Sequence, residues 1–275
     1  MSFGSSTVET TAYGTAFGGY SFPVAAGRKV SVRHYTLAPG QVITWGRTPE
    51  TVIGVLWDGD EGGVTNYLGC RQKQTWKLGH GFYFLRSKAA GTLDGVTVNE
   101  SKSPAEVYAI VSEAPGQPQA QADLHTDNGV PENPPVPAGG CPTGEPATMQ
   151  EVGSAVSTGD GSFRADDHQG IAVYTVKAAP GYASGWHYLS DPGFLIQTKG
   201  TVEVWSNCST KRVQEPGKAY VNDSMTRSER ITNSGTSPAE FLIVSFNQPD
   251  FYPPDLGPAL PELPPSDCVD TGIPR

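Results

Sequence analysis

Three side chains in the second half of the sequence could carry out acid–base chemistry. His187 is a candidate because an imidazole titrates near neutral pH, and Tyr188 or Glu229 could serve as its partner acid or base. Such a set would suit an isomerase or a lyase that works without a metal. The alternative is that His187 is a hydrogen-bonded residue of the protein interior. The chain holds only five histidines, and none of the other four lies next to His187 in the sequence.

Four cysteines could form two disulfide bonds, and four cysteines allow three pairings. The repeat described next favours Cys70 with Cys141 and Cys208 with Cys268, because each copy then holds one cysteine near a hairpin and one at the end of a proline-rich tail. By the chain-entropy argument, closing loops of this length contributes about 3–5 kcal/mol each. Free thiols and a zinc site are the alternatives, although the sequence has no CxxC pair and no histidine next to a cysteine.

The elements that must position these side chains occur twice, because the sequence repeats itself. The tetrapeptide SPAE at 103–106 returns 134 positions later, Cys70 returns 138 positions later as Cys208, and the tripeptide APG at 38–40 returns 141 positions later. The landmarks keep one order in both copies. We therefore predict a first repeat over residues 1–144 and a second over residues 145–275, each a globular unit followed by a proline-rich tail.

Within each copy the pattern predicts an all-β fold. The candidate strands are short runs of β-branched and aromatic residues between glycine, proline or polar turns, and none carries an apolar stripe at helical spacing. We expect two tandem jelly-roll barrels, with extended tails at roughly 114–140 and 247–275. The predicted strands lie at 30–37, 51–57, 82–85, 107–111, 171–176, 194–198, 201–205, 219–221 and 241–246.

Polar and aromatic side chains inside such barrels could bind a small molecule. Tyrosine, tryptophan, asparagine and arginine together suit a polar ligand with ring faces, such as a sugar or another hydroxylated metabolite. Alternation along each strand decides which side chains point inward, and the alternative for the first copy is a filled core. The candidates are His187, Gln197, Tyr220, Asn222 and Arg227 in the second copy, and Trp45 and Arg47 in the first.

Glycine and histidine spacing in the second copy resembles a known family. Gly181, His187 and Gly200 have the spacing of the first cupin motif, and a second glycine-led segment begins at Gly217. The chain is most similar to small actinobacterial cupin-domain proteins with a Gly-Trp-His motif, a mid-domain cysteine and a proline-rich tail that bears a cysteine. The resemblance implies a degenerate bicupin, with two cupin-like barrels in tandem.

The departures from that family concern its metal site. The resemblance would imply a metal held by about three imidazoles and one carboxylate. Leu189 and Gly193 stand at the positions of the second histidine and the glutamate, the segment 217–229 has no histidine, and Gly46 stands at the His187 position of the first copy. We therefore expect no metal and no other cofactor.

Composition narrows the partners and the location. The net charge of −9 and the pI of about 5.0 argue against binding to a nucleic-acid backbone. No run of about 18 apolar residues exists, so we expect no membrane span. Disulfide bonds would place the protein outside a cell or on a particle surface, although the N-terminus lacks the basic and apolar regions of a secretory signal.

These observations favour a non-metal bicupin that acts as an extracellular or surface module. Its expected partner is a small polar molecule, another protein or a further copy of itself, which would make a homo-oligomer. Two alternatives stay open. One is a structural component of a virion or surface assembly, and the other is a metal-independent isomerase or lyase that uses His187.

Overall fold

The structure, a computed structural model, is all-β in the part of the chain that it describes. It describes residues 6–16, 20–45, 51–68, 72–84, 95–113, 141–159, 162–165, 169–188, 192–208, 210–222 and 228–247. Every helix or strand assigned within these ranges is a β-strand, which confirms the predicted fold class. Apart from Asn247, both predicted tails lie outside the described residues.

The strands fall into two sets, one for each half of the chain. The first set is β1 (Ser6–Ala16), β2 (Tyr20–Pro23), β3 (Lys29–Leu37), β4 (Val42–Trp45), β5 (Thr51–Asp58), β6 (Val64–Leu68), β7 (Gln72–Trp76), β8 (His80–Phe84), β9 (Gly95–Asn99) and β10 (Ala105–Glu113). The second set is β11 (Thr148–Ser157), β12 (Ser162–Ala165), β13 (Gln169–Ala178), β14 (His187–Tyr188), β15 (Gly193–Lys199), β16 (Val202–Ser206), β17 (Thr210–Gln214), β18 (Lys218–Asn222), β19 (Ser228–Thr232) and β20 (Ala239–Asn247).

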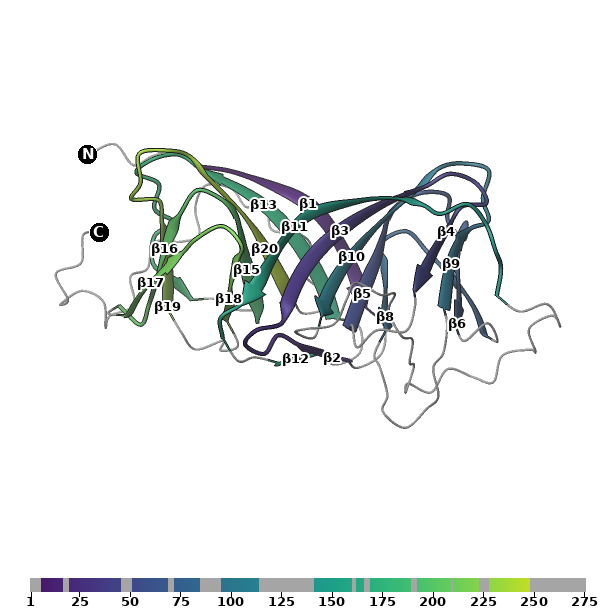
Figure 1. The fold of residues 1–275 in the computed structure, drawn as a ribbon, viewed down its shortest axis with the longest axis horizontal. Coiled ribbons are helices and arrows are strands. Elements are labelled where there is room, and N and C mark those ends of the chain that lie inside the picture. Colours follow the sequence, from purple (N-terminus) through teal and green to yellow (C-terminus); the bar gives the residue numbers. More distant parts are fainter. Residues whose placement is uncertain are drawn as a thin grey trace.

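One large sheet runs through both halves and two smaller sheets lie at its ends (Figure 1). The large sheet closes on itself in the order β1-β13-β20-β15-β18-β11-β3-β10-β5-β8. The sheet β4-β9-β6-β7 packs against its first-half strands, and β14-β19-β16-β17 packs against its second-half strands. The result is two cupin-like barrels, each enclosed by half of the large sheet and one small sheet.

The topology repeats with the sequence. Adding ten to both strand numbers turns every pairing within the first half into a pairing within the second half, and β1–β13 has its counterpart in β11–β3. Both first strands carry a bulge at the equivalent place, between Thr10 and Ala12 in β1 and between Glu151 and Gly153 in β11. The internal duplication is therefore visible in the strand register as well as in the sequence.

The two barrels share strands. The first strand of each half pairs in the sheet of the other half, so that β1 lies against β13 and β11 lies against β3. The sequence suggested two barrels each built from its own copy, and the structure shows instead that the copies exchange their first strands. The boundary between residues 144 and 145 stays a prediction.

Three apolar cores follow from the alternation of side chains along the shared strands. On β10, Val107, Ala109 and Val111 face the interior of the first barrel, whereas Ile110 faces the space between the barrels. The core of the second barrel contains Val202, Val204 and Ile231 of the small sheet with residues of β13, β15, β18 and β20. The core between the barrels takes side chains from both halves and joins them.

Aromatic stacking holds the core between the barrels. The ring of Phe22 lies 6.1 Å from that of Phe194 and 5.7 Å from that of Phe246, measured between centroids. Each buried phenylalanine contributes about 1.5–3 kcal/mol through the apolar area removed from water. One of these rings comes from the first half and two from the second, so this stabilisation depends on both copies.

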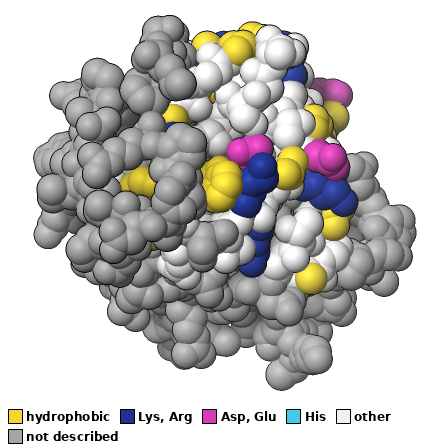
Figure 2. All heavy atoms as spheres, turned by 90° about the vertical axis from the view of Figure 1, so that its left-hand side faces the viewer, with side chains coloured by type: hydrophobic (Ala, Val, Ile, Leu, Met, Phe, Trp, Pro, Cys, Tyr) yellow, Lys and Arg dark blue, Asp and Glu magenta, His cyan; other side chains and the backbone are white. Residues whose placement is uncertain are grey.

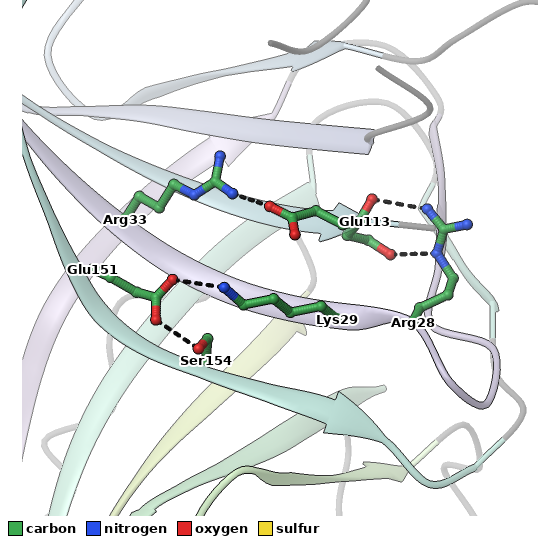
Figure 3. A network of polar contacts seen from close by, with 7 residues as sticks. Arg28, Lys29, Arg33, Glu113, Glu151 and Ser154 are labelled. Carbon is green, nitrogen blue, oxygen red and sulfur yellow. Dashed lines mark hydrogen bonds and ion pairs between the residues drawn. The ribbon is translucent and has the colours of Figure 1, made fainter. Parts of the chain in front are cut away.

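A polar network ties β3 to both of its neighbours (Figure 3). Lys29 Nζ lies 3.0 Å from Glu151 Oε2, and Ser154 Oγ donates to Glu151 Oε1 at 2.6 Å. Arg33 forms an ion pair with Glu113 of β10. Glu151 and Ser154 lie on β11, so this network joins the first copy to the exchanged strand of the second.

The loop that contains the repeated SPAE motif is braced in the same way in both copies. Asn233 Nδ2 donates to the carbonyl oxygens of Ala178 at 2.9 Å and Ser237 at 3.0 Å. Asn99 Nδ2 makes the equivalent bonds to Leu37 at 2.9 Å and Ser103 at 2.8 Å. These buried bonds fix the end of each small sheet against the large sheet.

Candidate functional site

A group of buried polar side chains lies inside the second barrel. Tyr220 Oη donates a hydrogen bond to Glu229 Oε1, and Ser206 Oγ lies 3.1 Å from Tyr220 Oη. The three residues are 3%, 2% and 6% exposed, respectively. Two hydroxyl groups thus lead to one carboxylate in a protected interior, which is an arrangement that can bind a polar group or move a proton.

Strand alternation and register bring this group together. Ala219 and Val221 belong to the core between the barrels, so Tyr220 between them faces the opposite side, into the second barrel. On the facing small sheet, Ser206 and Glu229 are direct partners across β16 and β19. Ser206 continues the inward-facing series of Val202 and Val204, which places a hydroxyl group at the end of an apolar row.

The surroundings keep the tyrosine protonated. Burial, the charge of Glu229 and the hydrogen bond to it raise the pKa of Tyr220 to about 12. At neutral pH the phenol is therefore a hydrogen-bond donor rather than a base. The guanidinium carbon of Arg212 lies 5.4 Å from the centroid of the Tyr220 ring and partly opposes this shift.

Arg212 reaches the ring from an edge strand. It lies on β17, the last strand of the small sheet in the described pairing order, directly opposite Val204. Its side chain is exposed to solvent, whereas Tyr220 beneath it is buried. A cation from the solvent side thus covers the aromatic face of the site.

Two glutamines add acceptors to the same barrel. Gln197 is fully buried, and its Nε2 donates to the carbonyl oxygens of Lys199 at 2.8 Å and Gly200 at 3.2 Å. Within the described residues, Gln197 Oε1 and Gln214 Oε1 are buried without a hydrogen-bond partner. Gln197 therefore braces the β15–β16 hairpin with one end of its amide, and its predicted role in ligand binding stays a prediction.

The backbone brings His187 to the same group. His187 is the direct cross-strand partner of Glu229, and Tyr188 is the partner of Ser228. Asn222 pairs with Gly193 at the end of β18. The acid–base residues proposed from the sequence thus meet in register on β14 and β19. Arg227 and Arg47, which were predicted to bind a ligand, lie outside the described residues.

The first barrel contains a different series of hydrogen-bonded polar side chains. Trp45 is 2% exposed, and its Nε1 donates to Thr97 Oγ1 at 2.6 Å. Thr97 in turn donates to Asn66 Oδ1. Trp45 also packs edge-on against Tyr35, with 5.6 Å between ring centroids. It is a residue of the apolar core, and its predicted contact with a ligand stays a prediction.

Sequence reasoning missed Ser206, Arg212, Thr97 and Asn66. None of them lies in a motif, and each lies in a strand of five residues that holds other polar side chains as well. The available signal was the alternation itself, because Ser206 follows Val202 and Val204 at steps of two residues.

The described cysteines are not free thiols. Cys208 is buried against Trp186 and Trp205, and Cys141 packs against Val42 and its neighbours on the outer side of the first small sheet. Their predicted partners, Cys70 and Cys268, lie outside the described residues. The pairing of Cys70 with Cys141 and of Cys208 with Cys268 therefore stays a prediction.

The metal ligands of a cupin do not occur as a group among the side chains that the structure describes. Within those residues, no group of three or more histidine, cysteine, aspartate or glutamate side chains lies together. Glu229 accepts a hydrogen bond from Tyr220, whose hydroxyl group also contacts that of Ser206. The described chain also has no helix long and apolar enough to cross a membrane.

Comparison with known proteins gives matches among solved structures. No protein-family model and no curated protein matches the sequence. The oxalate decarboxylase of Lactobacillus farciminis is 14% identical, with a TM-score of 0.35, over 90% of this chain and 85% of its own. The oxalate decarboxylase of Bacillus subtilis is 12% identical, with a TM-score of 0.37, over 92% of this chain and 79% of its own.

Another solved structure matches a shorter part of the chain. A sugar phosphate isomerase of the cupin superfamily from Silicibacter pomeroyi is 21% identical, with a TM-score of 0.27, over 29% of this chain. The matched part spans about half of that protein, 52% of its length. These similarities concern the fold alone. The strand order itself, with one sheet closed on itself and a four-stranded sheet packed against each half, fits the all-β fold of two barrels that the sequence predicts.

Proposed function

We propose that this cupin-fold protein binds a small polar molecule in its second barrel. The observation that supports this is the buried group of Ser206, Tyr220 and Glu229. Burying a carboxylate costs free energy that an apolar side chain would not cost, even when hydroxyl groups bond to it. A polar group kept in a barrel interior at such a cost is typical of a binding or catalytic site.

The first barrel is proposed to be structural. Its interior is filled by Trp45, Trp76 and Leu56, all buried within one apolar cluster. Its polar chain ends at an amide rather than at a charged group. A ligand that needs a carboxylate therefore finds one in the second barrel, whereas Trp45, Trp76 and Leu56 offer none in the first.

Isothermal titration calorimetry tests this proposal with a panel of neutral sugars and polyols. We expect at least one member to bind the full chain and Glu229→Gln to weaken that binding at least tenfold, because the amide removes the charge at constant shape. Thr97→Val in the first barrel is the matched control and should leave the affinity unchanged. Equal binding by wild type and Glu229→Gln would contradict the proposed site.

A second proposal is proton transfer without a metal. The strand register favours it, because His187 is the cross-strand partner of Glu229. Two titratable residues thus stand side by side on the backbone, and Tyr220 donates a hydrogen bond to one of them. In this reaction a proton leaves the hydroxyl-bearing carbon of a hydroxyketone for one of these residues and the carbonyl oxygen takes up a proton, which gives an enediol. The proton then returns to the former carbonyl carbon as the original hydroxyl group loses its proton and becomes the new carbonyl, which completes an isomerisation.

Deuterium exchange tests the second proposal. A hydroxyketone substrate incubated in D2O should acquire deuterium with wild type, and His187→Ala and Glu229→Gln should each abolish the exchange. Binding without any exchange by wild type would leave the first proposal and remove the second.

The predicted disulfides and location belong to the same proposal. We propose that Cys70 pairs with Cys141 and Cys208 with Cys268, and that the protein works in an oxidising place, outside a cell or on a particle surface. Peptide mapping without reduction should recover both linked peptides. Recovery of any of the four cysteines as an alkylated thiol would contradict the pairing.

A further inference from the structure

We infer that the second-barrel site binds a small organic cation, with a primary ammonium or a guanidinium group, beside Glu229 and the ring of Tyr220. This inference rests on the proposed function, because it names the ligand class of the same site. It is carried by the charge of the buried group, by the cation already placed on the aromatic ring and by the unmatched acceptors of the barrel.

The charge of the buried group favours a cation. Glu229 contributes a carboxylate in a nearly water-free position, whereas Ser206 and Tyr220 are neutral hydroxyl groups. A positive ligand gains a charge-assisted hydrogen bond there, and low local polarity strengthens it. An anionic ligand would place a second negative charge beside the first.

The aromatic ring already interacts with a cation. The guanidinium carbon of Arg212 lies 5.4 Å from the Tyr220 centroid, within the range of a cation–π interaction. Arg212 has no carboxylate partner among the described residues, although Lys211 beside it pairs with Glu203 at 2.7 Å. The chain's own side chain thus occupies the position that the cation of a ligand would take.

The exposure of Arg212 makes it displaceable. It reaches the ring from the edge strand β17, and the end of the molecule that carries this sheet shows basic and acidic side chains side by side (Figure 2). An exposed arginine loses little when it turns into water, because water solvates it there. A ligand cation can therefore replace it at the ring while the fold stays the same.

Two further buried polar atoms of the barrel are acceptors. The Oε1 atoms of Gln197 and Gln214 are buried without a hydrogen-bond partner among the described residues. A buried acceptor gains from a donor and gains nothing from another acceptor. A ligand rich in N–H donors matches this interior, and a carboxylate or phosphate does not.

Calorimetry with matched probes tests the inference on the full chain. Ethylguanidine and n-butylamine carry the cation, n-butanol is the neutral control and butyrate is the anionic one. We expect the two cations to bind, with an affinity that falls as salt is added, and butanol and butyrate to bind at least tenfold more weakly. Butyrate or butanol binding as tightly as the cations would overturn the inference.

A substitution of Arg212 tests the competition between its guanidinium group and the ligand cation most directly. Arg212→Gln removes the competing cation, so it should tighten binding of n-butylamine by about threefold or more, whereas Glu229→Gln should weaken it at least tenfold. Lys177→Gln, which removes one exposed positive charge on β13, is the control for general electrostatics and should leave the affinity unchanged. Unchanged or weaker amine binding by Arg212→Gln would show that the arginine does not compete with the ligand cation and would overturn the inference.

The outcomes separate the two proposals. If neutral sugars bind through Glu229 and amines do not, the proposed function holds and the cation inference is wrong. If neither panel binds, both are wrong.

Discussion

The two barrels have one scaffold and two different interiors. By the repeat offsets, Gly95 takes the place of Glu229 in the first barrel, and Leu56 takes the place of Gln197. Trp76 likewise takes the place of Gln214. The loops that hold the small sheets, in contrast, keep the same asparagine and the same bonds in both copies.

This difference shows where the two copies are still alike and where they have diverged. The asparagine brace and the strand register serve the fold and occur twice. The polar group serves the interior of one barrel and occurs once. Variants that act on the brace should therefore affect both copies alike, whereas variants that act on the interiors should affect the two barrels differently.

The largest expected effect is in the filled barrel. Trp45→Ala should lower the free energy of unfolding by about 3–5 kcal/mol, because it leaves a cavity in a packed core and removes the bond to Thr97. Urea denaturation measures this loss, and ligand affinity measured below the transition should not change. A loss below about 1 kcal/mol would show that the first barrel is not tightly filled.

The shared brace should come next. Asn99→Ala and Asn233→Ala each remove two buried bonds to backbone carbonyls, and each should cost about 3 kcal/mol. The comparison predicts that the two costs agree within about 1 kcal/mol. A large cost in one copy and none in the other would show that the duplicated loops have also diverged.

The polar group of the second barrel should show a smaller and coupled effect. Tyr220→Phe leaves Glu229 with one donor fewer and should cost about 2 kcal/mol in the free energy of unfolding. In a Glu229→Leu background the same change should cost less, because no carboxylate then needs the phenol. Denaturation of the two single variants and the double variant measures the coupling, and additive costs would contradict it.

The smallest effect concerns the junction between the two copies where β3 pairs with β11. Burial raises the pKa of Glu151, but hydrogen bonds from Ser154 and Lys29 outweigh it and hold that pKa below its ordinary value. The pair therefore stabilises the fold above the ordinary glutamate pKa, and this contribution disappears as the pH falls through the lowered value. Because both side chains are about one-third exposed, the contribution at pH 7 should be about 0.2–1 kcal/mol.

Thr10 on β1 occupies the position equivalent to Glu151, at the junction of β1 with β13. It therefore provides the control for the Lys29–Glu151 pair. Glu151→Gln should flatten the dependence of stability on pH below about pH 5, whereas Thr10→Val should not change it. Denaturation curves between pH 3 and pH 7 would show this. An unchanged pH dependence in Glu151→Gln would mean that the ion pair contributes nothing.

Much of the fold could be predicted from the sequence because it rests on local patterns. Alternating β-branched residues mark strands such as Val202–Ser206, and repeated glycine, proline and cysteine landmarks mark the copies. The exchange of first strands could not be predicted in this way. It depends on the pairing of β1 with β13, which are about 160 residues apart and carry no motif that names the partner.

The candidate site was predicted in part. Glu229 was expected as an acid or base and Tyr220 as a ligand contact, but their mutual hydrogen bond depends on two facing sheets and has no signature in sequence. Ser206 and Arg212 were missed for the same reason. Their importance follows from a neighbour across the barrel and not from the residues beside them.

The exchange of first strands also constrains how such a chain can arise. A protein of one copy would pair its first strand only through the short parallel contact with its own sheet, β1 with β8 or β11 with β18, and would leave an edge at β3 or β13 unpaired. Two such molecules would complete each other by trading that strand, as in a domain-swapped homodimer. The present chain has the architecture of such a dimer joined end to end, and the joining lets one barrel hold the buried carboxylate of Glu229 while the other holds none at the equivalent position.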